Sequence, residues 1–333
     1  MMRDLKASFT VAAVLVGTVV GAGYASGREL WDFYGSYGPV GVPSSLATGL
    51  LLGLAACRAL SLAEDAPGYA ALSSAWPSAF ALALEGVGTL FLWVILAATL
   101  AAAGALTSSM GGLSFLQGLI LFGALIGALA LGGARSLASV HSLLVPYMVL
   151  FFGALTLGKP IPSPEPSAPH PALPFPFFWA ALLYAAYNFL PLLGALLALD
   201  LDVARRGRRG AIFGGFVLGL LSALAVLLLL RHPPDAQDPL PFLTLARGLG
   251  PLWVVGYQAL LLAALSTTAL SSQVALQQRL KLPSALAVPI PLLAALPLAI
   301  LGLPWIVSRL YPVVGAASLG LLAFVLWPRR RRR

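Results

Sequence analysis

The 333-residue sequence carries little charge: Asp, Glu, Lys and Arg make up 9% of it, against about 25% in soluble domains. It has one cysteine, Cys57, so no disulfide can form within the chain. A Walker loop, a zinc motif and a nucleophile elbow are all missing. With no metal or acid–base constellation, we expect that the protein is not an enzyme.

Hydrophobic residues make up 59% of the chain, in recurring runs long enough to cross a bilayer, which takes about 20 residues. This pattern indicates an all-α membrane protein that crosses the bilayer many times. The expected spans are ten, at 7–36, 39–60, 80–107, 113–132, 137–157, 176–199, 209–230, 250–279, 284–302 and 304–327.

The net charge of +9 reflects membrane topology rather than nucleic-acid binding. With the N-terminus placed in the cytoplasm, fifteen of the 20 Lys and Arg residues fall on the cytoplasmic side and five on the other. Both termini are then cytoplasmic, and the basic tail, 328–333, contacts anionic lipid or anchors the topology. A signal-peptide interpretation of the N-terminus is disfavoured, because cleavage would discard the glycine-rich first span.

A proline-rich external connector, 158–175, divides the chain into two halves of five spans, 1–157 and 176–327. An odd number of spans per half gives the second half the opposite orientation. A 5+5 inverted repeat, which is common in secondary transporters, has this property.

The first span of each half contains helix-breaking residues near its middle. Gly17, Gly21, Gly23 and Gly27 lie within the first span, and Pro191, with Asn188 before it and Gly194 after it, lies within the sixth. Both helices are therefore expected to break at the midplane. The freed backbone groups must face a cavity or ligand, since lipid cannot satisfy them. Helix packing or simple kinking is the alternative explanation.

The motif GTVVGAG resembles the broken first helix of sodium-coupled transporters with the leucine-transporter fold. The longer stretch GAGYASGRELWDFYGSYG is still more similar to the YkvI-type family of bacterial membrane proteins, which is assigned to the amino acid/polyamine/organocation superfamily. This resemblance implies a ten-helix transporter in the bacterial cytoplasmic membrane. It does not supply an established substrate.

In the eighth span, AALSTTAL resembles the hydroxyl pair that completes a sodium site in those symporters. The resemblance implies one Na⁺, held by the carbonyl oxygens of Gly17, Val20 and Ala263 and the hydroxyls of Ser266 and Thr267. The alternative is that these hydroxyls bond back to carbonyl oxygens of their own helix.

The solute is expected between the two breaks and the third and eighth spans. The candidate contacts are Gly21, Ala22, Gly23, Tyr24, Ser26, Thr89, Trp93, Tyr184, Tyr187, Asn188 and Ser271. A structural role for Asn188, as a partner of freed carbonyls, is equally open. Arg28 and Glu29 are candidates for an external gate, with Asp32 or an acid of the 232–238 loop as a further partner of Arg28.

The sequence thus favours a secondary transporter that couples Na⁺ to the symport of a small amino-acid-like solute. The first alternative is a proton-coupled transporter or antiporter of the same fold, using Glu85, although a residue snorkelling at the interface explains Glu85 more simply. A channel would need a continuous polar face along several helices. A non-transporting membrane sensor or scaffold would not need the polar groups of the cavity.

Overall fold

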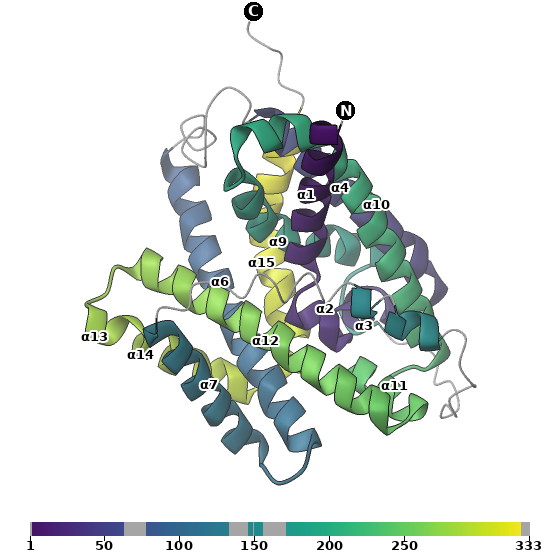
Figure 1. The fold of residues 1–333 in the computed structure, drawn as a ribbon, viewed down its shortest axis with the longest axis vertical. Helices are drawn as coiled ribbons and strands as arrows, with labels where there is room; N and C mark the ends of the chain where they lie inside the picture. Colours follow the sequence, from purple (N-terminus) through teal and green to yellow (C-terminus); the bar gives the residue numbers. More distant parts are fainter. Residues whose placement is uncertain (1, 63–77, 133–145, 149, 156–170, 328–333) are drawn as a thin grey trace, which may run out of the picture.

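The computed structural model describes residues 2–62, 78–132, 146–148, 150–155 and 171–327, and the regular structure in these ranges is entirely helical (Figure 1). In chain order the labelled helices are α1 (Met2–Val19), α2 (Ala22–Ser26), α3 (Arg28–Phe33), the 3-10 helix η1 (Gly35–Val40), α4 (Gly41–Leu62), α6 (Ser78–Ser109), α7 (Phe115–Leu131), α9 (Phe177–Leu197), α10 (Leu201–Arg231), α11 (Pro241–Leu249), α12 (Pro251–Leu280), α13 (Ser284–Ala287), α14 (Pro289–Ile300) and α15 (Leu303–Leu326).

Six helical stretches in the described part of the chain are long and apolar enough to cross a membrane. They are 35–62, 85–109, 177–197, 201–231, 251–280 and 303–326. α7 and the α13–α14 region are shorter apolar helices, and the first predicted span is interrupted. Most of the fifth predicted span and most of the connector lie outside the described residues, as does the whole basic tail.

The predicted break in the first span is confirmed. α1 ends at Val19, and the Gly21 amide donates to the Val19 carbonyl at 2.8 Å instead of continuing the helix. A second interruption falls at Gly27, whose φ of 85° lies in the left-handed region that favours glycine. The first span is therefore one long helix followed by two short ones.

The predicted break in the sixth span is wrong. α9 runs without interruption from Phe177 to Leu197, with Pro191 inside it. Proline at this position removes only the amide that would bond the Tyr187 carbonyl, and a membrane helix tolerates this loss where neighbouring helices pack around it. α9 has such neighbours in α1, α4 and α15. Of the two matching breaks that the sequence predicts, the structure contains one.

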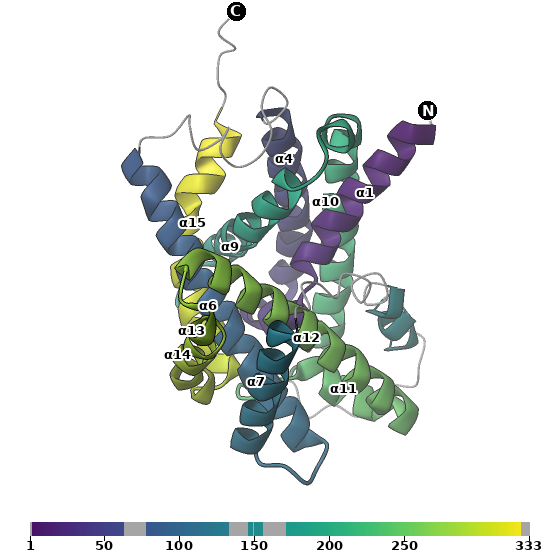
Figure 2. The same cartoon turned by 60° about the vertical axis from the view of Figure 1, so that its left-hand side comes forward.

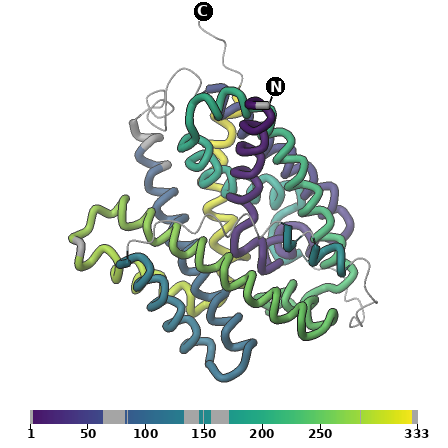
Figure 3. The backbone as a smooth tube through the Cα atoms, in the orientation of Figure 1, coloured from purple at the N-terminus to yellow at the C-terminus, as the bar shows by residue number. Residues whose placement is uncertain are grey.

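The helices pack in two groups. α1, α4, α9 and α10 pack on one another, while α6 packs against α7, α12 and α14 (Figures 1 and 2). The tube in Figure 3 shows α1 beginning and α15 ending toward the same end of the molecule. This agrees with an even number of membrane crossings.

Glycine brings the backbones of the first group together. A Cβ at Gly49 or Gly53 of α4 would collide with the backbone of α10, and one at Gly215 of α10 would collide with α4. Gly207 and Gly210 of α10 approach the backbone of α1 in the same way. Small residues at helix interfaces are the usual means of close packing in lipid.

Candidate functional site

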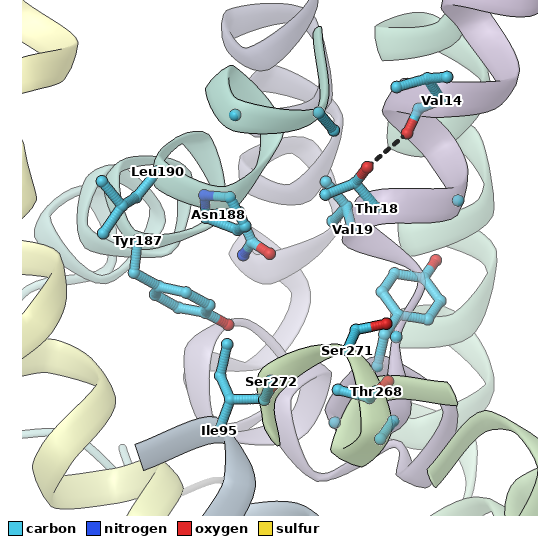
Figure 4. Close-up of a pocket in the computed structure, with 18 of the residues that line it drawn as sticks. Val14, Thr18, Val19, Ile95, Tyr187, Asn188, Leu190, Thr268, Ser271 and Ser272 are labelled. Atoms are coloured by element: carbon cyan, nitrogen blue, oxygen red, sulfur yellow. Dashed lines mark hydrogen bonds between the residues drawn. The ribbon is translucent and has the colours of Figure 1, made fainter. Parts of the chain in front are cut away.

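A cavity of about 1250 Å³ lies where the two groups of helices meet. Its walls come from α1, α2, α3, α6, α9, α10, α12 and α15. Figure 4 shows Thr18 of α1, Asn188 of α9 and Ser271 of α12 around one space. Most of the wall is apolar with a few polar groups, as is usual for a small-molecule site.

The cavity opens at the end of the molecule where α1 begins. Phe9, which lines it there, is 71% exposed. Across the opening, Arg279 of α12 donates to Glu85 Oε2 of α6 at 2.9 Å, and both side chains are exposed. Glu85 is thus the partner of an arginine at the mouth of the cavity, which the sequence did not predict.

The opposite end is closed by buried polar contacts around Arg28. The Arg28 guanidinium pairs with Asp32 at 2.7 Å, and both residues are buried. The same side chain donates to the carbonyls of Ala236, at 2.7 Å, and Asp238, at 3.2 Å. These bonds join α3 to the segment between α10 and α11. Arg28 is therefore buried and fixed by these contacts, with Asp32 as its acidic partner, and its role as a gate stays a prediction.

Two further contacts cover this closed end. The Tyr37 hydroxyl donates to the Phe175 carbonyl at 2.8 Å, and the Ala172 amide donates to Ser36 Oγ at 3.1 Å. These two bonds attach the segment that precedes α9 to η1, which directly follows α3. The cavity is accordingly accessible from one end and covered at the other.

Glu29, the other gate candidate, does not pair with Arg28. Its side chain is buried, lines the cavity, and accepts a hydrogen bond at Oε2 from the Tyr187 hydroxyl at 2.9 Å. The Tyr311 hydroxyl interacts with the same carboxylate. The carboxylate also lies against Gly23, where a Cβ would overlap it. Glu29 is therefore part of the cavity wall rather than of the closure.

The structure brings most of the predicted solute contacts to the cavity. Those that line it are Gly21, Ala22, Gly23, Tyr24, Tyr187, Asn188 and Ser271. Asn188 also has the structural role left open by the sequence, because its side-chain amide donates to the Tyr184 carbonyl at 3.0 Å. Tyr24 is held by a 3.2 Å hydrogen bond to Ser222 of α10.

Four of the predicted solute contacts do not line the cavity, and their side chains bond to or pack against other parts of the protein. Ser26 donates to the Gly23 carbonyl at 2.6 Å, and Thr89 donates to the Glu85 carbonyl at 2.8 Å near the mouth. The Trp93 indole donates to the Pro291 carbonyl at 3.2 Å. Tyr184 is buried against the rings of Phe33, Tyr34 and Tyr187. Their polarity serves local bonding and packing.

Of the predicted sodium ligands, Gly17 lines the cavity and Val20 is buried at the break. Ser266 donates to the Leu262 carbonyl at 2.8 Å, and Thr267 to the Ala264 carbonyl at 2.8 Å. These are the bonds within a helix that the alternative interpretation expected. They leave hydroxyl lone pairs free to accept an ion, so the sodium site stays a prediction. The neighbouring Thr268, which was not predicted, lines the cavity and faces Gly21.

Comparison with known proteins supports a membrane protein. No protein-family model matches the chain. It is 24% identical over 345 aligned positions to the uncharacterized membrane protein YkvI of Bacillus subtilis (strain 168), covering 100% of this chain and 99% of YkvI. It is 22% identical to the uncharacterized protein YyaD of the same organism, over 94% of each chain. The similarity thus extends over the full length.

Sequence reasoning missed the contacts that join distant parts of the chain. Glu29 and Tyr187 are 158 residues apart, and Glu85 and Arg279 are 194 apart, so no local pattern indicates either pair. One signal was available in the sequence. A carboxylate within a membrane span is costly, which makes Glu29 a candidate for a functional role.

The cavity is large enough to hold a solute of moderate size. In the described residues, no group of three or more His, Cys, Asp or Glu side chains is placed to hold a metal ion. The polar groups that line the cavity include hydroxyls, the Asn188 amide, the Glu29 carboxylate and, at the mouth, the Glu85–Arg279 pair, and these suit hydrogen bonding and charge recognition.

Proposed function

We propose that this protein is a secondary transporter that moves a small organic solute across the bacterial cytoplasmic membrane by alternating access. The observation that carries this proposal is the cavity beside the break in the first span, open at one end and closed at the other. Alternating access requires a site that faces one side of the membrane at a time.

The positive-inside bias gives the direction in which the cavity faces. It puts the N-terminus, and hence the mouth of the cavity near Phe9, on the cytoplasmic side. The described conformation is then inward-open. Arg28, Asp32 and the carbonyls of Ala236 and Asp238, to which Arg28 donates, form the outer closure, which must open for solute to enter from outside.

The packing of the helices supports the same proposal. The group of α1, α4, α9 and α10 and the group around α6 and α12 meet at the cavity, and each group takes helices from both predicted halves of the chain. Movement of one group against the other is then what opens the cavity to each side in turn. The resemblance of GTVVGAG to the broken helix of sodium-coupled transporters supports membership of the same superfamily.

For coupling we propose Na⁺ at the set of Gly17, Val20, Ala263, Ser266 and Thr267, because α1 ends at Val19 and the Gly17 carbonyl loses its helical partner, the Gly21 amide, which donates to Val19 instead. The proton-coupled alternative through Glu85 is disfavoured. Glu85 is exposed and paired with Arg279, whereas a proton carrier must be shielded from one side of the membrane.

The test is transport by the purified protein in sealed lipid vesicles. A thermal-stability screen against amino acids and amines, in sodium and in choline buffer, first finds a ligand, because a bound ligand raises the melting temperature. The radiolabelled ligand should then enter protein-containing vesicles faster than empty ones, with an inward sodium gradient accelerating uptake. If no compound stabilises the protein and no uptake exceeds that of empty vesicles, a sensor or scaffold role replaces the proposal.

A further inference from the structure

Of the charged side chains in and around the cavity, four form two ion pairs and one carboxylate, Glu29, does not. Arg28 and Asp32 neutralise each other, and the remaining donors of Arg28 are used by backbone carbonyls. Glu85 and Arg279 neutralise each other at the mouth. Glu29 is left as a carboxylate on the cavity wall with no basic partner among the described residues.

Among the described residues, the side chains that contact Glu29 are hydrogen-bond donors, and none of them is positively charged. α9 contributes the hydroxyls of Tyr187 and, further off, Tyr184, and α15 contributes Tyr311. Tyr34 lies toward η1, and on its own helix the near titratable groups are Arg28 and Asp32. The guanidinium of Arg28 is directed to Asp32 and the 236–238 carbonyls, away from Glu29.

An uncompensated carboxylate within a membrane protein is expensive and usually marks a functional site. Aromatic rings stand around it: Tyr187 lies 5.0 Å from Tyr311 and 5.7 Å from Phe91, centroid to centroid. Ring faces attract organic cations, as does a carboxylate. The end of α1 also lines the cavity with Gly17 and Thr18, and the Gly17 carbonyl oxygen lacks its helical partner there, since the Gly21 amide donates to Val19.

The cavity therefore offers a carboxylate, a carbonyl oxygen and aromatic faces, all of which favour a positively charged group. We propose that Glu29 is the anionic subsite that binds the ammonium group of the solute, so that the transported compounds are primary amines or amino acids rather than simple carboxylic acids. This inference rests on the proposed transport function and names the solute class for its site.

The experiment measures binding by the purified full-length protein at about pH 7, where primary amines are protonated. The probes are n-alkylamines of increasing chain length, each with the alcohol and the carboxylate of the same length. In the wild type, one or more amines should raise the melting temperature, and the matched alcohol and carboxylate should not. Absence of any amine effect in the wild type would overturn the inference.

Glu29→Gln should weaken amine binding by about tenfold or more, since it removes the charge that compensates the ammonium group. Glu85→Gln is the matched control: the same change at the mouth of the cavity should leave amine affinity within about twofold. Equal amine affinity in Glu29→Gln and the wild type would contradict the assignment.

Glu29→Asp is a second variant, which keeps the test valid if Glu29→Gln does not fold. It keeps the charge, so it should discriminate the amine from its matched alcohol, with lower affinity because the shorter side chain retracts from the cavity. Loss of this discrimination in a folded Glu29→Asp protein would also count against the subsite. Vesicle uptake that persists for a non-amine solute would refute the ammonium subsite while leaving the transport proposal standing.

Discussion

At the residue scale, the structure explains why position 23 is a glycine, which the sequence alone could not explain. The sequence predicts that the glycines of the first span break the helix and that the freed backbone groups face a cavity or ligand. At Gly23 the space that a side chain would take is occupied by the carboxylate of Glu29 from the next short helix. Gly21 differs, because a Cβ there would meet only Thr268 Oγ1, at an ordinary 3.6 Å. The two glycines can therefore be told apart by experiment.

Gly23→Ala should force the Glu29 carboxylate away from its position and break its hydrogen bond with Tyr187. We expect ligand affinity to fall by about tenfold or more, with a loss of stability of about 1–3 kcal/mol from overpacking. Gly21→Ala is the matched control for stability and should leave the melting temperature of the ligand-free protein almost unchanged, because its Cβ meets only Thr268 Oγ1 at 3.6 Å. The measurements are the melting temperature of each variant without ligand and the ligand-induced stabilisation of Gly23→Ala, and an equal loss of stability in the two variants would contradict this account.

At the element scale, one predicted break exists and the other does not. Four glycines within the first span lower helix propensity at several successive turns, and the helix ends at Val19. In α9 a single proline removes one hydrogen bond, and packing against α1, α4 and α15 keeps the helix intact. Sequence patterns report propensity, but tertiary packing decides whether an isolated defect breaks a helix. Most helix positions were predictable from apolar runs, whereas the pairing of Glu29 with Tyr187 depends on how α3 and α9 pack.

The predicted sodium site joins two elements, the end of α1 and the middle of α12. The double change Ser266→Ala, Thr267→Ala would remove two of five proposed oxygen ligands. It should abolish sodium-dependent thermal stabilisation while costing little stability in choline buffer, since both hydroxyls bond only to their own helix in the described contacts.

Glu85→Gln serves as the control for coupling and should leave the sodium effect unchanged. If sodium still stabilises the double variant, the ion binds elsewhere. If transport is lost in Glu85→Gln instead, the proton-coupled alternative should replace the sodium assignment.

At the scale of the whole molecule, the cavity opens toward the end where α1 begins and α15 ends. Ser271 lines the cavity and is exposed, whereas Ser36 lies buried at the closed end. Because these two positions lie on opposite sides of the Arg28–Asp32 closure, they report separately on the two openings.

In a Cys57→Ser background, Ser271→Cys should react with a membrane-impermeant thiol reagent applied to the cytoplasmic face of inverted membrane vesicles. Ser36→Cys should react slowly from either face in this conformation. Bound ligand should slow labelling of Ser271→Cys if it occupies the cavity. Fast labelling of Ser271→Cys from the external face alone would reverse the proposed orientation.

The glycine contacts of α10 with α4 and α1 have a mechanical consequence. Where backbones touch at Gly49, Gly53 and Gly215, there are no long side chains whose rotamers could absorb a sliding motion. These three helices should therefore move as one rigid unit. The chain between α1 and α4 carries the left-handed Gly27, where a Cβ would meet the Phe242 ring, so the short helices α2 and α3 on either side of it are attached to this unit at both ends.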